Sequence, residues 1–265
     1  MEDQSASQSS AFAEMYDAIY GLRDDIGLWR ALAADASGPL LELGCGTGRV
    51  LVPLARAGFE VTGIDLSPDM LERCRERVRS EPPEAGGRVA LVEADMTSFD
   101  LGRRFALITC PFGGFQQLRT VEQQLACLER CREHLLPRGT LALDLPNPDP
   151  APAAYAGEQV TDGEATAELV EWTGGRRIRW WVTIIGYDRA HQWSDCEVTL
   201  EIIEPDGATR RVTESISLRY IFRYELEHLL VRAGFRVVAL YGDYDRSPFG
   251  DASPAMIAVA QPAFE

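Results

Sequence analysis

The chain has 265 residues, of which 46% are hydrophobic and 25% are charged, and this is the composition of an ordinary globular protein. It excludes a largely disordered, fibrous or membrane-embedded chain. With 26 basic and 41 acidic residues the formal net charge is −15, which disfavours binding to nucleic-acid backbones and to anionic lipid. We therefore expect no DNA partner and no membrane association.

The N-terminal region, residues 1–37, is predicted to be a helical cap. Its first ten residues are polar and acidic, and no uncharged apolar run in the chain approaches the ~18 residues of a membrane span, so we expect a cytoplasmic protein. The pattern over residues 12–21 places Tyr16 and Tyr20 on one helix face. An apolar stripe of a cap helix explains the same residues.

From Leu40 to Asp144, short apolar runs alternate with longer amphipathic stretches, which is typical of βα units on a parallel sheet. Helical spacing over residues 50–57, 68–78 and 121–135 separates these runs, and Ser67-Pro68 is a helix-start signal. The predicted strands are residues 40–43, 59–64, 89–92, 105–109 and 140–145.

A proline-rich stretch, residues 146–152, ends this alternation. Four β-branched and aromatic runs with glycine turns follow, and they predict an antiparallel β-meander over residues 149–220 that covers the acceptor site or forms a dimer contact. A helix at 223–233 and strands at 235–241 and 256–260 then complete a seven-stranded, doubly wound Rossmann-like sheet. We expect residues 38–148 and 221–265 to form this α/β core.

The first predicted strand ends in three alternating glycines, Gly44, Gly46 and Gly48, directly before a helix. Backbone N–H groups in such a turn face whatever lies above the sheet. The second strand ends in Asp65, where a carboxylate can accept both hydroxyls of a ribose. Together these features predict a nucleoside-binding crevice at the carboxyl ends of the strands.

The glycine spacing separates two classes of nucleoside. Dinucleotide binders need GxGxxG, whereas here the third glycine comes one residue early and Arg49 stands in the later position. A nicotinamide-dependent oxidoreductase is therefore disfavoured.

The segment Glu42 to Gly48, ELGCGTG, resembles the first motif of the class I S-adenosylmethionine-dependent methyltransferases. The resemblance implies that Asp65 binds the ribose, that Leu66 and Met70 flank the adenine, and that Asp95 and the Met96 backbone bind its edge. Similar N-terminal helices in the small-molecule branch reach the methionine carboxylate through tyrosines. The expected residues for binding S-adenosylmethionine are Tyr16, Tyr20, Glu42, Gly44, Cys45, Gly46, Gly48, Asp65, Leu66, Met70, Asp95, Met96 and Pro111.

The segment after the fourth predicted strand helps to indicate which class of molecule accepts the methyl group. Methyltransferases that act on adenine or glutamine nitrogen carry an Asn- or Asp-Pro-Pro-aromatic motif here, whereas this chain has Cys110 and then a single proline before Phe112. DNA adenine is therefore disfavoured. The expected acceptor contacts are Phe112, Phe115, Arg219, Arg223 and Tyr224, although ordinary solvation of strand ends is the somewhat better explanation of any one of the last three.

We expect methyl transfer to nitrogen or oxygen of a small molecule by in-line displacement. A hydroxyl acceptor needs a base, for which Asp243, Tyr244 and less favourably His191 are the candidates, while a neutral amine does not. The absence of a well-placed histidine favours N-methylation. A protein or RNA methyltransferase and a non-catalytic binding module remain alternatives, and a second copy of the chain is a candidate partner.

The six cysteines include no CxxC pair, so we expect reduced, mostly buried thiols. Cys127, Cys131 and His134 share one face of an amphipathic helix, a pattern that favours packing over metal binding. We expect no metal site.

Overall fold

The computed structural model describes residues 10–21, 23–148, 164 and 167–263. The chain divides into two compact units, one made of residues 1–23 and 149–220, the other of residues 24–148 and 221–265. Helix α1 (Ser10–Tyr20) belongs to the first unit and α2 (Ile26–Asp35) to the second. The functional division into cap, core and insertion stays a prediction.

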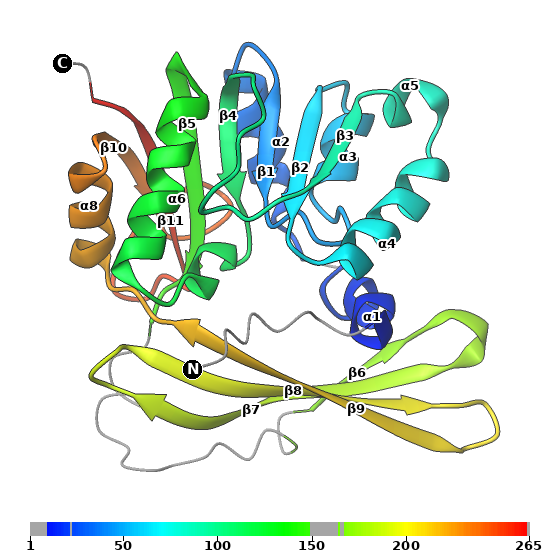
Figure 1. Cartoon of the computed structure of the whole chain (residues 1–265). Coiled ribbons are helices and arrows are strands. Elements are labelled where there is room, and N and C mark those ends of the chain that lie inside the picture. The colour runs from blue at the N-terminus through cyan, green and yellow to red at the C-terminus, as the bar shows by residue number, and fades with distance from the viewer. Residues whose placement is uncertain (1–9, 22, 149–163, 165–166, 264–265) are drawn as a thin grey trace. The chain divides into compact units, whose positions relative to one another are not determined.

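The larger unit is built on a seven-stranded sheet in the order β10-β11-β5-β4-β1-β2-β3 (Figure 1). Strand β11 runs antiparallel to both of its neighbours, and the other adjacent pairs are parallel. The predicted Rossmann-like sheet is therefore confirmed, and the carboxyl end of β10 lies at the same edge as those of β1 to β5. The strands are β1 (Leu40–Leu43), β2 (Val61–Asp65), β3 (Val89–Glu93), β4 (Phe105–Cys110), β5 (Leu135–Pro146), β10 (Phe235–Tyr241) and β11 (Ala255–Pro262).

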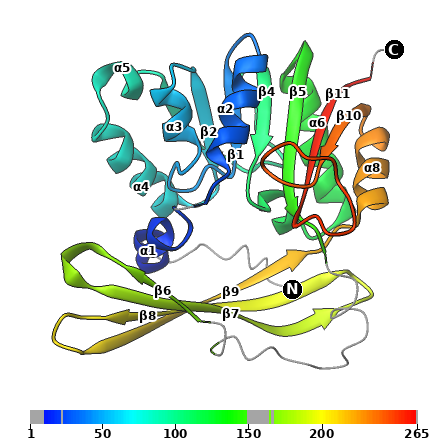
Figure 2. The ribbon, with the colours of Figure 1, turned by 180° about the vertical axis from the view of Figure 1, so that it is seen from behind.

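Helices cover both faces of this sheet, as the two opposite views show (Figures 1 and 2). Helices α2, α3 (Leu51–Arg56) and α4 (Pro68–Arg79) pack in one apolar cluster, while α6 (Val121–His134) and α8 (Arg223–Arg232) pack in the other. Strand β1 serves both, because Leu40 joins the first cluster and Leu41 the second. The short helix α5 (Pro83–Gly86) precedes β3, and the 3₁₀ helix η1 (Gly114–Gln117) follows β4.

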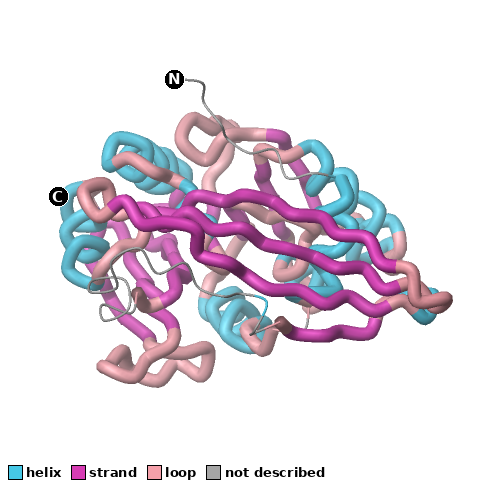
Figure 3. The backbone as a smooth tube through the Cα atoms, turned by 90° about the horizontal axis from the view of Figure 1, so that it is seen from below, coloured by secondary structure: helices cyan, strands magenta, loops and turns pink. Residues whose placement is uncertain are grey.

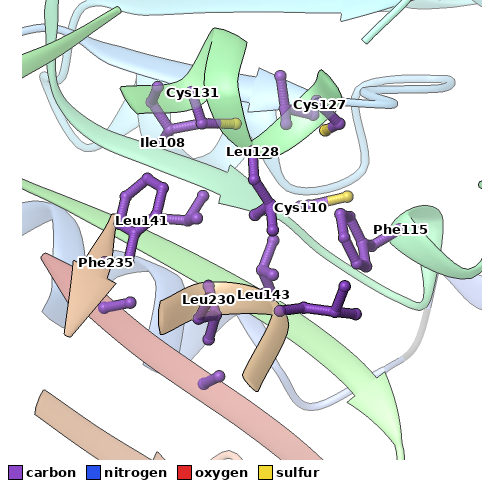
Figure 4. Close-up of a cluster of buried hydrophobic side chains, with 14 of the residues drawn as sticks. Ile108, Cys110, Phe115, Cys127, Leu128, Cys131, Leu141, Leu143, Leu230 and Phe235 are labelled. Carbon is purple, nitrogen blue, oxygen red and sulfur yellow. The ribbon is translucent and has the colours of Figure 1, made fainter. Parts of the chain in front are cut away.

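Five of the six cysteines pack in these two clusters, and the sixth, Cys196, lies in the smaller unit. Cys110, Cys127 and Cys131 lie among leucine, isoleucine and phenylalanine side chains in the cluster under α6 and α8 (Figure 4). All six thiols are free and buried, as the sequence predicted.

Helix boundaries follow local capping chemistry. The Ser67 hydroxyl accepts the Met70 N–H at 3.4 Å and Pro68 is the first helical residue of α4, which confirms the predicted start signal. Thr120 and Gln123 form a capping box at the start of α6. Caps of this kind hold the helix starts next to the carboxyl ends of the strands.

The smaller unit contains the four-stranded antiparallel sheet β6-β7-β8-β9, whose long strands run side by side in Figure 3. Its strands are β6 (Glu168–Glu171), β7 (Arg177–Asp188), β8 (Trp193–Ile203) and β9 (Thr209–Arg219). Gly174 and Gly175, in the 3₁₀ turn η3 (Thr173–Gly175), and Gly207 adopt positive φ between consecutive strands. The predicted meander is confirmed, and α1 packs against β6, β7 and β9.

Over the described ranges, no helix combines the length and the apolar character that a bilayer span requires.

Gly48 tests the packing beneath the glycine turn. Its φ is +79°, and a Cβ built there would lie 2.6 Å from the Cys74 Sγ, whereas Gly58, at φ +99°, has nothing within 4 Å of such a Cβ. We expect Gly58→Ala to lower the free energy of unfolding by about 1–2 kcal/mol through backbone strain alone. Gly48→Ala should lose a further ~1–3 kcal/mol through overpacking. Urea unfolding measures both, and equal losses would contradict the packing argument.

Candidate functional site

The glycine turn after β1 requires glycine at three positions. Gly44, Gly46 and Gly48 have φ of 61°, 53° and 79°, a left-handed conformation that other residues rarely adopt. Turn conformation continues to Val50, so α3 begins at Leu51, one residue later than expected. A Cβ built on Gly46 meets nothing within 4 Å. This part of the turn therefore leaves space beside its backbone.

Asp65, the last residue of β2, holds the turn in place. Its Oδ2 accepts the Gly46 N–H at 2.8 Å, and its Oδ1 accepts the Ser67 N–H at 2.8 Å. Burial raises the pKa of this carboxyl, and the bonds from Ser67 and Gly46 act in the opposite direction. Since a carboxylate has about four acceptor positions, Asp65 can accept further donors such as hydroxyls.

Glu42 lies buried in the middle of the sheet, between Gly63 of β2 and Thr109 of β4. Its Oε2 has no hydrogen-bond partner. Burial raises the pKa of this carboxyl well above its usual value, nearby Cys74, Asp25 and Asp65 raise it further, and Arg49 opposes them. A buried acceptor without a donor is costly, so a bound group with an N–H donor would satisfy this position.

The end of β3 brings a third loop beside the turn. The Ala94 N–H donates to the Asp65 carbonyl at 3.0 Å, and the Met96 Cε lies 3.8 Å from a Cβ built on Gly44. Asp95 is exposed, and its Oδ1 accepts both the N–H and the hydroxyl of Thr97 at 2.7 Å. The structure thus gathers residues predicted from three separate strand ends at one place.

The two residues expected to flank an adenine differ in exposure. Leu66 is 52% exposed directly after Asp65, whereas Met70 is 2% exposed and packs inside the protein. Leu66 therefore offers an apolar surface beside the carboxylate, whereas the buried Met70 side chain offers little surface to a ligand.

A buried ion pair that no sequence pattern indicates lies beside the glycine turn. Arg49 donates to both carboxylate oxygens of Asp25 at 2.6 and 2.7 Å, and the Trp29 Nε1–H adds a bond to the same carboxylate at 3.3 Å. Asp25 and Arg49 are 0% and 6% exposed. Nothing in the spacing of these residues signals the pair, because helix α2 has to pack beside the glycine turn before they can meet.

Asp144, near the end of β5, is a second buried carboxylate that the sequence did not single out. Its Oδ2 accepts the Phe112 N–H at 2.8 Å, and the Tyr244 hydroxyl donates to its two oxygens at 3.1 and 3.3 Å. Asp243 in turn accepts the Tyr244 N–H at 2.7 Å. The loop after β10 therefore reaches the end of β4 through this carboxylate.

The other acceptor candidates of this unit lie in varied surroundings. Phe115 is fully buried in the core (Figure 4), a position of packing rather than of acceptor contact. Pro111, which was expected to contact the cofactor, is buried beside Phe112. Arg223 pairs with Glu227 at 2.9 Å, and Tyr224 is 65% exposed. Their predicted contact with an acceptor stays a prediction.

His191 and Arg219 belong to the smaller unit. The Nδ1 of His191 lies 2.7 Å from the Asp188 carboxylate, and its ring stacks on Trp193 at 4.8 Å between centroids. The Arg219 guanidinium donates to the Gln192 side chain at 3.5 Å. These contacts account for both residues locally, and their predicted roles are untested.

Tyr16 and Tyr20 also belong to that unit, on one face of α1 as expected. Their ring centroids are 4.8 Å apart, and the Tyr20 ring lies 5.5 Å from that of Trp180 in β7. Burial raises the pKa of the Tyr20 hydroxyl to about 12, so it stays protonated at neutral pH. Their role in binding a cofactor stays a prediction.

No group of three His, Cys, Asp or Glu side chains within the described ranges is arranged to hold a metal ion.

The His134 Nε2 accepts the Leu101 N–H at 3.1 Å, and its Nδ1 lies 2.8 Å from the Arg130 carbonyl. This histidine therefore fastens the loop before β4 to helix α6.

Comparison with known proteins finds similar methyltransferases in both sequence and fold. A family profile described as "Methyltransferase domain" matches residues 40–139. The dTDP-3-amino-3,6-dideoxy-alpha-D-glucopyranose N,N-dimethyltransferase of Streptomyces fradiae is 28% identical over 245 residues, which cover 89% of this chain and 88% of that protein. The CcbJ methyltransferase from Streptomyces caelestis superposes with a TM-score of 0.77 and 27% identity, over 96% of both chains.

A third similar protein was solved with the ligand expected here. It is the SAM-bound amino pentose methyltransferase CalS10 from Micromonospora echinaspora, with a TM-score of 0.68, 25% identity and coverage of 94% of this chain and 97% of that chain.

Glu42 makes stability depend on pH. A folded-state pKa above the unfolded value means that the wild type loses stability as the pH rises through the folded pKa, whereas the neutral Glu42→Gln variant does not. We expect the free energy of unfolding of Glu42→Gln, relative to the wild type, to be higher at pH 8 than at pH 5. Urea unfolding at both values measures this difference. The exposed Glu93→Gln is the matched control, and a difference for Glu42→Gln that is constant with pH would contradict the prediction.

Proposed function

Because the chain is a class I S-adenosylmethionine-dependent methyltransferase of small molecules, we propose that it methylates the amino group of an amino sugar. Two similar proteins, a dTDP-amino-sugar N,N-dimethyltransferase and an amino pentose methyltransferase, support this substrate class. The main structural support for the cofactor site is the 2.8 Å hydrogen bond from the Gly46 N–H to Asp65. This bond joins the glycine turn to the acid that is expected to bind the ribose.

The residues at the carboxyl edge fit S-adenosylmethionine. Asp65 has acceptor capacity left for the ribose hydroxyls, Glu42 has a buried oxygen that lacks a donor, and Gly46 faces open space. We assign Leu66 to one face of the adenine and Asp95 to its amino group. When bound, S-adenosylmethionine supplies a methyl group on a positively charged sulfur.

The remaining task of the protein is to place the acceptor lone pair in line with that methyl group and to keep water out. Positioning of this kind can supply about 7–11 kcal/mol of a barrier. A neutral amine loses its proton only after the new bond has formed, so no strong base is needed. The Tyr244 hydroxyl donates a hydrogen bond to Asp144, so its proton is already engaged, an arrangement that favours an amine over a hydroxyl acceptor.

The cofactor assignment predicts that Asp65→Ala weakens the binding of S-adenosylmethionine by at least about tenfold, because it removes charge-assisted hydrogen bonds. Titration calorimetry measures the affinity. The exposed Asp69→Ala, in the first turn of α4, is the matched control and should bind as the wild type does. Wild-type affinity in Asp65→Ala would refute the assignment.

The acceptor assignment predicts transfer to a dTDP-linked amino sugar. We expect one or two methyl groups to be added at the amino nitrogen, detected by mass spectrometry together with the release of the demethylated cofactor. The matching sugar with a hydroxyl in place of the amine should not react. Transfer to the hydroxyl sugar, to RNA or to protein but not to the amine would contradict the proposal.

A further inference from the structure

Phe112 has an unusual backbone. It is one of three non-glycine residues with positive φ among the described ranges, at 53°, and it is followed by Gly113 at φ 69°. The left-handed conformation is unfavourable for a residue with a Cβ and persists only where neighbouring contacts impose it. These two residues come directly after β4, at the carboxyl edge where the acceptor is expected.

Asp144 imposes this conformation from the neighbouring strand. Its side chain accepts the Phe112 N–H and its carbonyl accepts the Gly113 N–H, each at 2.8 Å. Asp144 is 2% exposed, so these bonds form out of contact with bulk water. Hydrogen bonds to a charged group are stronger than those between neutral groups, and removal of one partner leaves the carboxylate poorly solvated.

Tyr244 reaches Asp144 from the loop after β10. Its hydroxyl lies 3.1 and 3.3 Å from the two carboxylate oxygens, although the two residues are 100 positions apart in the sequence. The donor from Tyr244 offsets part of the cost of burying the charge and limits the rotation of the carboxylate. The orientation of Asp144, and through it that of the Phe112 peptide, therefore depends on the Tyr244 hydroxyl.

The Phe112 ring has a contact of its own. The guanidinium of Arg49 lies 5.8 Å from the ring centroid, and the same guanidinium is fixed by its two bonds to Asp25. A cation at this distance attracts the ring face. Phe112 is therefore held through its peptide by Asp144 and through its ring by Arg49. Arg49 directly follows Gly48, the last glycine of the glycine turn.

We propose that Asp144 and Tyr244 are positioning residues for methyl transfer, which fix Phe112 as the wall against which the acceptor amine is placed. This inference rests on the proposed function, because it takes the acceptor to lie at the end of β4. Neither residue has to touch the reacting atoms. Their effect on the rate comes through the position of Phe112, and displacement of a positioning residue by a fraction of an ångström is enough to slow an in-line transfer.

The test removes the Tyr244 hydroxyl and nothing else. With a dTDP-linked amino sugar as the probe, we expect Tyr244→Phe to lower kcat by about tenfold and to leave the affinity for S-adenosylmethionine unchanged. Tyr241→Phe, which removes a hydroxyl at the end of β10, is the matched control and should keep the wild-type kcat. If Tyr244→Phe keeps the wild-type kcat, or loses cofactor affinity in proportion to kcat, the proposal is overturned.

A double variant tests whether Tyr244 acts on the rate through Asp144. If Tyr244 acts through Asp144, combining Tyr244→Phe with Asp144→Asn should lower kcat no further than the more harmful of the two single changes. Losses that multiply would show separate roles and would overturn the proposal. Phe112→Gly removes the ring and keeps a residue that adopts positive φ, so kcat should fall at least as far as in Tyr244→Phe, and a wild-type kcat would overturn the proposal.

A measurement without an acceptor separates this proposal from the function it rests on. Hydrogen exchange at the Phe112 amide should be faster in Tyr244→Phe than in the wild type and in Tyr241→Phe, because the bond to Asp144 is loosened. Unchanged exchange overturns the positioning role whatever the substrate. A wild type that binds S-adenosylmethionine but transfers no methyl group to any amine overturns the proposed acceptor instead.

Discussion

The cofactor side of this site depends on the hydrogen bond from the Gly46 N–H to the Asp65 carboxylate. The bond can form only because β1 and β2 are adjacent and parallel, in a register that pairs Leu43 with Ile64 and brings the two strand ends level. The same carboxylate accepts the Ser67 N–H and so fixes the start of α4. One side chain therefore positions a turn, a strand end and a helix around the space proposed for the ribose.

Three buried carboxyl groups, on or near strands of the central sheet, are a second constraint. The carboxyl groups of Glu42, Asp25 and Asp144 are all nearly inaccessible to water, and the ionised form of a buried carboxyl group carries a desolvation cost. Arg49 neutralises Asp25, while Tyr244 and the Phe112 peptide donate to Asp144. Glu42 keeps an unsatisfied oxygen, which is costly in the free protein and useful where a bound ligand brings the missing donor.

The reversed strand β11 explains how the two halves of the site meet. Because β11 runs antiparallel between β5 and β10, β10 is parallel to the rest of the sheet. Its following loop consequently lies at the carboxyl edge, and Tyr244 can reach Asp144 at the end of β5. The strand topology thus joins the predicted acceptor loop to the end of β4, where Phe112 is held.

The sequence by itself determined what depends on neighbours along the chain. Glycines at 44, 46 and 48 were predictable because their positive φ excludes most other residues, Ser67 because capping is local, and the strands because apolar runs report burial. Only the tertiary structure decided the partners of Arg49 and Asp144, the burial of Phe115 and the exposure of Leu66. Such contacts join residues that are far apart in the chain. Strand order, strand register and the packing of both sheet faces bring these residues together, and the local spacing of residues in the sequence does not determine any of the three.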